Sequence, residues 1–328
     1  INPMNKSQSA LAMLGPFLIF VAAMLWATDA PFRVFLTGEL NSSFIVLAEH
    51  FIDILIALPL LLLGWSELKK LSAKEWVAVL VIAIGSSALA SIAFTESFRY
   101  VNPSVAILLQ KLQPLVAIAL ATILLKETLR AKFWLWAILA IAGAYLLSFP
   151  KLVPQVYEGE IFNPNTMGVL LALVAAALWA VGTVLGRFVL RTITFKTLTS
   201  LRFVGAFIFL LIFNLSQDSI PALSTVSGKD WLFIVIVAVT SGLVSLFLYY
   251  YGLQYTRASV ATLAELGFPL AAVLINAYFI ESVHQPGTFL GLFALQWLGT
   301  ALLLFALYRL SRFNQAEKID IETAAQIS

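Results

Sequence analysis

The sequence predicts an all-α integral membrane protein of ten transmembrane helices, arranged as two inverted five-helix repeats. The first observation is compositional: 61% of the residues are hydrophobic and 11% are charged, whereas soluble domains carry about 25% charged residues. The second is a series of ten apolar segments, each close to the roughly 20 residues that a membrane-spanning helix needs. The third is a pattern of polar residues and prolines in the first half that returns in the second.

Short connections separate most of the apolar segments, so neighbouring helices are expected to run antiparallel. The longest connection, residues 150–165, is interpreted as an external linker between a first repeat at residues 10–149 and a second at 166–310. A polar tail at residues 311–328 follows, expected on the cytoplasmic side. The segments cover about residues 14–36, 44–63, 76–98, 104–125, 133–149, 167–190, 198–215, 231–251, 259–280 and 289–310.

An internal duplication is clearest in the fourth and ninth segments. Three residues of the fourth recur in the ninth after 155, 155 and 154 positions: Ser104, Pro114 and Glu127 return as Ser259, Pro269 and Glu281. The sequence VAAMLWA around Trp26 similarly returns as VAAALWA around Trp179. Because each repeat has an odd number of spans, the second enters the membrane from the opposite face. Such inverted repeats allow two halves to rock about a site near the midplane.

Basic residues predict the orientation of the chain, because cytoplasmic loops are enriched in lysine and arginine. Of the twenty basic residues, four fall on one side (Arg33, Arg99, Lys151 and Lys229), Lys111 lies within a span, and the other fifteen fall on the opposite side. The richer side is taken as cytoplasmic, which places both termini there in an inner or plasma membrane. The apolar run after Lys6 lacks a small-residue cleavage site and is expected to be a retained span.

Composition also limits the chemistry and the partners of the chain. The absence of cysteine excludes disulfides, thiolate catalysis and cysteine-ligated zinc. The slight basic excess forms no basic run with interleaved aromatic residues, so no nucleic-acid partner is expected. No metal site, catalytic group or cofactor is predicted. The expected partners are the lipid bilayer and a small-molecule solute, and a homodimer is left open.

Two prolines inside spans predict bent helices, because proline lacks an N–H and frees the carbonyl four residues earlier. For Pro114 and Pro269 these carbonyls belong to Gln110 and Glu265, at equivalent mid-membrane positions. Polar side chains and freed carbonyls at one depth are tolerated where they line a water-filled cavity. We therefore predict a solute site here. The alternative is a packing kink in which Gln110 is bonded to a neighbouring helix.

Ionisable residues inside the first repeat are expected to face the interior, since each costs roughly 2.5–3.5 kcal/mol at a helix centre. Judged from the helical rise of about 1.5 Å per residue, Lys111 lies at a depth where Glu49, Asp53 or Asp29 neutralises it. Asp29 and Glu49 are predicted gating or coupling residues. His50 is either a titrating gate or a buried histidine with both ring nitrogens hydrogen-bonded.

A second cluster is expected in the other repeat, where Glu265 and Arg202 lie at a similar depth. We predict that Lys111 and Arg202 meet a carboxylate of the solute, and that Glu265 or Asp53 meets an ammonium group. Burial of an unpaired carboxyl group favours its neutral form, so either carboxyl group is also a candidate for carrying a coupling proton. The alternative is that both clusters are static ion pairs that fix the register of the helices.

Aromatic residues supply further candidates for solute binding. Trp26 and Trp179 lie near mid-membrane, where an interfacial aromatic belt does not explain them, so they either line the cavity or pack between the halves. Tyr251 and Tyr255 share a helix face that could stack an aromatic solute, although an interfacial belt would look the same.

The pattern Ser104-Val105-Ala106, Pro114, Leu124-Leu125-Lys126-Glu127 and Gly143, with its copy through Ser259, Pro269, Glu281 and Gly299, resembles the drug/metabolite transporter superfamily. The resemblance is to the EamA-like ten-span family and covers residues 10–310. It implies secondary transport of small organic solutes such as amino acids or related metabolites, commonly outward, by alternating access. The family often has an arginine early in the second span of each half. Arg202 fits this pattern, but its counterpart here is His50.

Two rival functions belong to other classes. An intramembrane enzyme would have to use Glu49, His50 and Asp53, which match no zinc-helix spacing. A scaffold that transports nothing has no need of an inverted repeat with central prolines. Solute flux into proteoliposomes would distinguish a transporter from both.

Overall fold

The computed structural model describes residues 6–101, 103–148, 166–275 and 294–327. Within these ranges every regular element is a helix. Seven helical stretches of the described residues are long and apolar enough to cross a membrane: residues 10–39, 42–63, 73–97, 166–189, 195–216, 228–253 and 294–314. Three shorter apolar helical stretches cover residues 113–124, 131–147 and 258–272. The predicted linker at residues 150–165 and Glu281 lie outside the described residues.

The elements follow one another as α1 (Lys6–Trp26), α2 (Ala30–Glu39), α3 (Ser42–Leu63), α4 (Trp65–Leu68), α5 (Ala73–Leu80), η1 (Val81–Leu89), α6 (Ala90–Ser97), α7 (Pro103–Gln110), α8 (Gln113–Leu124), α9 (Ala131–Ser148), α10 (Thr166–Val189), α11 (Phe195–Ser216), η2 (Leu223–Thr225), α12 (Gly228–Val237), η3 (Ala238–Val244), α13 (Ser245–Leu253), α14 (Ala258–Ala264), α15 (Gly267–Ile275) and α16 (Ala294–Ile327). The polar tail expected after residue 310 continues α16 without a break.

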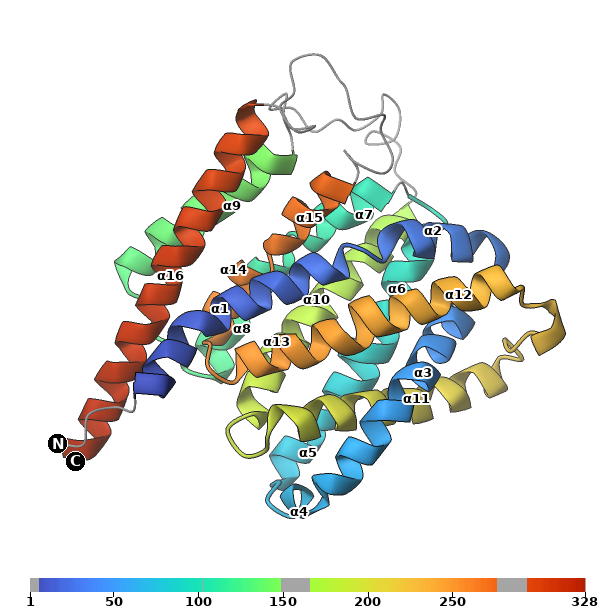
Figure 1. The fold of residues 1–328 in the computed structure, drawn as a ribbon, viewed down its shortest axis with the longest axis horizontal. Helices are drawn as coiled ribbons and strands as arrows, with labels where there is room; N and C mark the ends of the chain where they lie inside the picture. Colours follow the sequence, from blue (N-terminus) through green and yellow to red (C-terminus); the bar gives the residue numbers. More distant parts are fainter. Residues whose placement is uncertain (1–5, 102, 149–165, 276–293, 328) are drawn as a thin grey trace.

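Helices far apart in the sequence pack side by side (Figure 1). α9 packs against α16, α3 against α11, α8 against α14, and α1 against α13, while α10 packs against α6. The start of α1 and the end of α16 lie at the same corner of the molecule.

A reciprocal glycine contact joins α9 to α16. A Cβ atom on Gly143 would lie 2.7 Å from the backbone nitrogen of Leu303, and one on Gly299 would lie 2.6 Å from that of Leu147. Only glycine allows the two backbones to approach this closely, as in other membrane helix pairs packed through small residues. The contact therefore fixes α9 and α16 to each other.

Matching local signals begin the third helical stretch of each half. Ser72 and Glu75 form a capping box at the start of α5, and Ser227 and Asp230 form another at the start of α12. In both, the serine oxygen accepts from a backbone N–H and the acidic side chain accepts from the serine N–H, which satisfies groups left without helical partners. Each stretch then passes through a π-helical segment, η1 or η3. Such segments are frequent at functional sites.

The two proline-containing spans are broken rather than bent, which corrects the prediction of a simple kink. The first break separates α7 from α8 at Lys111, and the second separates α14 from α15 at Glu265. Pro114 lies in the first turn of α8, where its missing N–H costs no helical bond. The Glu265 carbonyl, expected to be free, accepts from the N–H of Phe268 at 3.0 Å, because the chain turns there before α15 begins.

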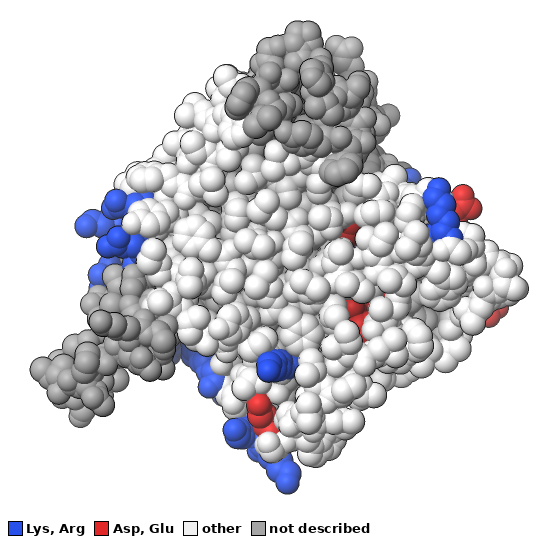
Figure 2. Space-filling model, viewed as in Figure 1, with Lys and Arg blue, Asp and Glu red and all other residues white. Residues whose placement is uncertain are grey.

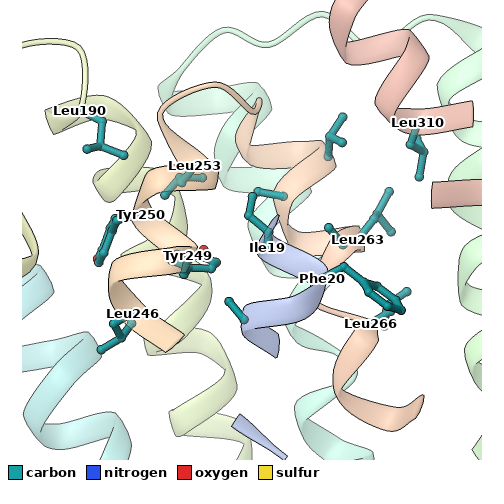
Figure 3. Close-up of a cluster of buried hydrophobic side chains, with 14 of the residues drawn as sticks. Ile19, Phe20, Leu190, Leu246, Tyr249, Tyr250, Leu253, Leu263, Leu266 and Leu310 are labelled. Carbon is teal, nitrogen blue, oxygen red and sulfur yellow. The ribbon is translucent and has the colours of Figure 1, made fainter. Parts of the chain in front are cut away.

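Apolar side chains form the core and also much of the exterior. The largest buried cluster joins α1, α13, α14 and neighbouring helices through residues such as Ile19, Tyr250 and Leu263 (Figure 3). Large apolar side chains such as Leu63 and Ile123 are 82% and 71% exposed, as expected for surfaces that face lipid. Figure 2 shows a broad uncharged face with two small acidic spots in its middle and basic side chains along its left and lower edges.

Candidate functional site

A central cavity lies among the helices and is lined by residues from both halves of the chain. Its empty space is about 890 Å³, its open side included, against about 370 Å³ for a second cavity beside it. Nine of the predicted site residues line the central cavity: Trp26, Asp29, Glu49, His50, Asp53, Gln110, Trp179, Arg202 and Glu265. Lys111, Pro114 and Pro269 line the second cavity. Their roles in binding stay predictions.

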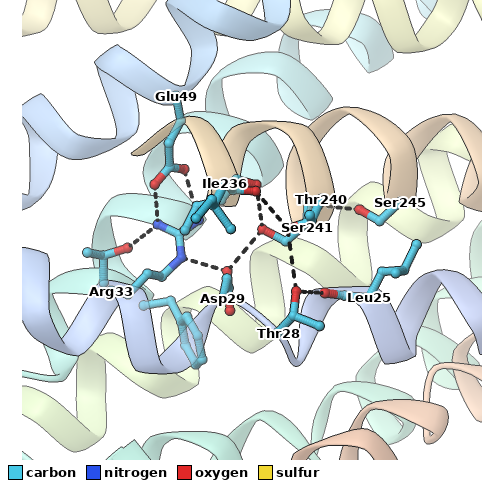
Figure 4. A network of polar contacts seen from close by, with 12 residues as sticks. Leu25, Thr28, Asp29, Arg33, Glu49, Ile236, Thr240, Ser241 and Ser245 are labelled. Atoms are coloured by element: carbon cyan, nitrogen blue, oxygen red, sulfur yellow. Dashed lines mark hydrogen bonds and ion pairs between the residues drawn. The ribbon is translucent and has the colours of Figure 1, made fainter. Parts of the chain in front are cut away.

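Arg33 is the centre of a buried ionic network (Figure 4). Its Nε donates to Asp29 at 2.6 Å, and its two terminal nitrogens donate to the two oxygens of Glu49 at 2.8 Å each. Nη1 also donates to Thr95 at 3.0 Å, and Ser241 of η3 reaches Asp29 at 3.4 Å. Paired, charge-assisted bonds of this kind are the strongest that side chains form. The network ties α2, α3, α6 and η3 together at the cavity wall.

This network corrects two expectations. Arg33 had been counted with the external loops, but it is buried in α2. Asp29 and Glu49 had been assigned to Lys111, but they pair with Arg33. The arginine is one helical turn after Asp29, and that i,i+4 spacing was the signal available in the sequence. The bond to Glu49 depends on how α2 and α3 face each other, which spacing does not encode.

A second polar chain connects α3 to α11 through η1. His50 Nδ1 lies 2.9 Å from the Val46 carbonyl, so it carries the proton there, and Nε2 lies 3.0 Å from the Ser87 hydroxyl. Arg202 donates to Ser87 at 3.1 Å, to the Tyr250 hydroxyl at 3.0 Å and to the Ser86 carbonyl at 3.3 Å. Both ring nitrogens of His50 are thus hydrogen-bonded, which agrees with the prediction of a buried, fully bonded histidine rather than a titrating gate.

Glu265, at the break between α14 and α15, accepts three hydrogen bonds. The donors are Tyr249 at 2.8 Å, Thr183 at 3.2 Å and the side-chain amide of Gln113. The expected ion pair with Arg202 is therefore replaced by neutral donors from α13, α10 and α8. These donors hold the carboxyl group at the cavity wall. Sequence reasoning missed all three because they come from three different helices.

Two acceptor atoms in the cavity lack a hydrogen-bond partner among the described residues. Oδ1 of Asp53 and Oε1 of Gln110 are buried and accept no hydrogen bond from the described residues. Asp53 is packed against Gly242 of η3, where a Cβ atom would lie 3.1 Å from both carboxyl oxygens. A buried acceptor without a donor costs free energy. Such atoms in a cavity are suited to a ligand that supplies the donors.

Two matching aromatic pairs also lie at the cavity. The rings of Trp26 and Tyr249 are 5.1 Å apart between centroids, and those of Trp179 and Phe94 are also 5.1 Å apart. All four side chains line the cavity, so it offers ring faces as well as polar groups. Tyr251 contributes nothing here, because it packs against Phe195 at 5.0 Å.

The described residues contain no group of three or more histidine and acidic side chains arranged to hold a metal ion. The cavity lining combines aromatic faces, carboxylates, amides, hydroxyl groups, His50 and two arginines.

Apolar helices around a polar cavity are typical of multi-pass membrane proteins that carry solutes. The family comparison is more specific. The model of the EamA-like transporter family matches the chain twice, at residues 13–149 and 166–312. The chain belongs to this family and is a membrane transporter, within the drug/metabolite transporter superfamily.

The chain is similar to three named relatives. It is 29% identical to the riboflavin transporter ImpX of Fusobacterium nucleatum over 92% of this chain and 98% of that protein. It is 28% identical to the uncharacterized transporter YwfM of Bacillus subtilis over 62% of this chain and 63% of that protein. It is also 23% identical to the uncharacterized transporter sll0355 of Synechocystis over 96% of this chain and 92% of that protein. A solved crystal structure shares the fold with a TM-score of 0.67 at 16% identity, covering 89% of this chain and 94% of that chain.

Proposed function

We propose that this protein is a ten-span secondary transporter whose two inverted five-helix repeats alternate access to the central cavity. Three observations support the proposal: the family model matches each half separately, the Gly143–Gly299 contact between α9 and α16 is reciprocal, and the aromatic pairs of Trp26 and Trp179 have equal spacing. The spans broken at Lys111 and Glu265 meet at the cavity, as discontinuous helices do at transporter binding sites.

The substrate that this cavity fits best is a neutral, ring-bearing solute that donates hydrogen bonds. The observation that carries this conclusion is the pair of unpartnered acceptors, Asp53 Oδ1 and Gln110 Oε1, in a cavity walled by aromatic rings. N–H or O–H groups of a solute would satisfy both oxygens, while its ring would lie against indole and phenyl faces.

Arg33 argues against a solute held by its carboxylate. Every side-chain nitrogen of Arg33 already donates to Asp29, Glu49 or Thr95. Every side-chain nitrogen of Arg202 likewise donates to a protein oxygen. The charge of Arg33 is already matched by Asp29 and Glu49, so a solute carboxylate would compete with two protein carboxylates there. Arg202 uses three of its five N–H groups in these bonds. Riboflavin, the solute in the name of the ImpX relative, is neutral and combines a fused ring with N–H and O–H donors, so we propose riboflavin or a close flavin as the substrate.

Direction and coupling complete the proposal. The family resemblance favours outward transport across the inner or plasma membrane, with both termini cytoplasmic. A proton is the proposed coupling ion. Asp53 is the preferred proton carrier, because Oδ1 of its carboxyl group has no hydrogen-bond partner among the described residues. Glu265 is the second carrier, and its bonds to Tyr249, Thr183 and Gln113 make it the more firmly positioned group.

Purified protein in proteoliposomes tests these points. We expect labelled riboflavin to exchange across the membrane and to accumulate against its gradient only when a pH gradient is imposed. Asp53→Asn keeps an acceptor oxygen but removes the titratable group, so we expect exchange without accumulation. Asp53→Leu removes the acceptor, so we expect both the exchange and the accumulation of riboflavin to fail. Glu96→Gln, outside the cavity, is the matched control.

The same assay distinguishes two classes of solute, flavins and amino acids. Amino acids follow from the family resemblance and from the predicted meeting of Lys111 and Arg202 with a carboxylate. Flux of amino acids without flux of riboflavin would refute the neutral-solute proposal. Riboflavin flux that is insensitive to both Asp53 variants would refute the role given to that residue.

A further inference from the structure

The second cavity lies where the two broken spans cross. Its wall is formed by α7, α8, α14 and α15 with Trp26 of α1. It shares five lining residues with the central cavity: Trp26, Gln110, Gln113, Glu265 and Phe268. The two spaces are therefore neighbours with a common wall. A solute longer than one ring could extend from one into the other.

Thr262 marks this space as a polar site. Thr262 lines the second cavity, and its buried hydroxyl oxygen has no hydrogen-bond partner among the described residues. Helical threonines can donate to the carbonyl three or four residues earlier. Four here donate to the carbonyl four residues earlier: Thr122 to Ile118, Thr199 to Phe195, Thr240 to Ile236 and Thr300 to Gln296. Thr262 departs from this pattern, so its hydroxyl remains available to a ligand.

The other polar groups of the second cavity define the ligand chemistry. Lys111 lines it and is a cation that can donate up to three hydrogen bonds. Gln110 presents Oε1, an acceptor that needs a donor. A hydroxyl group both donates and accepts, whereas a carboxylate or phosphate oxygen only accepts. The set of Lys111, Thr262 and Gln110 therefore matches a chain of hydroxyl groups better than an anion.

We propose that the second cavity is a subsite for a hydroxylated side chain of the transported solute, whose ring occupies the central cavity. This inference rests on the proposed function, because it assumes a ring-bearing solute there. Thr262 and Lys111 are then residues that distinguish a solute with such a chain from one without it. The ring of riboflavin carries a polyhydroxylated ribityl chain, and lumiflavin has the same ring with a methyl group in its place, so the two form a matched pair of probes.

Transport kinetics test the assignment. Thr262→Val keeps the shape and removes the hydroxyl, and Lys111→Met keeps the length and removes the charge. One lost hydrogen bond corresponds to about a two- to tenfold change in affinity. We therefore expect each variant to raise the KM for riboflavin by about that factor and to leave the KM for lumiflavin unchanged. Thr122→Val and Lys132→Met, at exposed positions on α8 and α9, are the matched controls.

Equal effects on riboflavin and lumiflavin, or none on either, would overturn the subsite while leaving flavin transport intact. A second measurement covers the case in which no flavin is carried. The chain has no cysteine, so Ile107→Cys, in the second cavity only, and Ser91→Cys, in the central cavity only, each introduce one thiol. We expect ribitol to slow thiol modification of the Ile107→Cys variant and not of the Ser91→Cys variant.

Protection of the Ile107→Cys variant by ribitol would support the subsite even if riboflavin is not the substrate. Absence of that protection would overturn the subsite. Failure of riboflavin transport alone would overturn only the proposed substrate, so the two failures are distinguishable.

Discussion

The ionic network at Arg33 yields a quantitative prediction about stability. Arg33→Met would leave the carboxyl groups of Asp29 and Glu49 buried without their cation. The paired side chains of Arg33 and Glu49 are only 9% and 6% exposed. Removing one partner of a buried ion pair costs about 3–5 kcal/mol, whereas replacing both partners by apolar groups is often close to neutral. We therefore expect Arg33→Met to be more harmful alone than when it is combined with Glu49→Leu.

The expected coupling energy between Arg33 and Glu49 in a double-mutant cycle follows from the geometry of the pair. Glu49 receives two parallel bonds of 2.8 Å from Arg33, and both are lost when either residue is replaced. Coupling energies between contacting residues span about 0.5–3 kcal/mol. Because this pair is bidentate and buried, we expect a value in the upper half of that range, about 2–3 kcal/mol. Asp29 retains part of the interaction with Arg33 in the Glu49→Leu variant, which makes that single variant the milder one.

The chain provides its own control for this double-mutant cycle. Arg99 and Glu96 also form an ion pair, at 3.1 Å, but their side chains are 36% and 29% exposed. Exposed pairs are worth about 0.2–1 kcal/mol because water screens the charges. The free energy of unfolding of the four proteins of each cycle would be measured by denaturant titration in detergent micelles. Equal coupling at the two pairs would refute the argument that burial makes the Arg33 network strong.

Two further predictions concern glycines whose surroundings differ. Gly143→Ala would push a methyl group into the backbone of α16 at 2.7 Å, so we expect a loss of about 1–3 kcal/mol in the free energy of unfolding. Gly38→Ala, with open space around it, should not destabilise the protein. Equal losses of unfolding free energy in the two variants would contradict this reading. Gly242→Ala would place a methyl group 3.1 Å from both oxygens of Asp53, so we expect reduced transport at normal expression. Gly85→Ala, whose nearest contact is an ordinary 3.5 Å, should transport normally, and the reverse order in flux measurements would exclude a role for the Asp53 position.

Features fixed by the local sequence could be predicted. The apolar segments follow from composition along the chain. The predicted all-helical fold agrees with the structure, and the predicted family agrees with the family comparison. The positions of irregularity in the two proline-containing spans were also foreseen, because proline acts on its own helix. Breakage rather than bending was missed, since it depends on the turns at Lys111 and Glu265.

Contacts between helices could not be predicted, because depth along a span does not fix rotation about its axis. The neighbouring tyrosines of α13 illustrate this limit. At about 100° per residue, Tyr251 is turned by about 200° from Tyr249. Tyr249 therefore faces the cavity and bonds Glu265, while Tyr251 packs against Phe195 on another side. The prediction of Tyr251 therefore identified the correct helix, α13, but the wrong face of that helix.

The two halves of the chain share a pattern but differ in chemistry at the cavity. In the register that relates Trp26 to Trp179, Arg33 corresponds to Gly186. Arg33 fills its position with an ionic network that reaches Thr95, whereas Gly186 leaves room for Tyr250, whose ring would lie 2.8 Å from a Cβ atom there. Opening a wall held by paired charges requires those charges to separate, while opening one packed around a tyrosine requires mainly apolar contacts to part. In the proposed alternating-access cycle, the two walls would therefore respond differently to charge, and the proposed coupling proton would act most directly on the half that contains Asp29, Glu49 and Asp53.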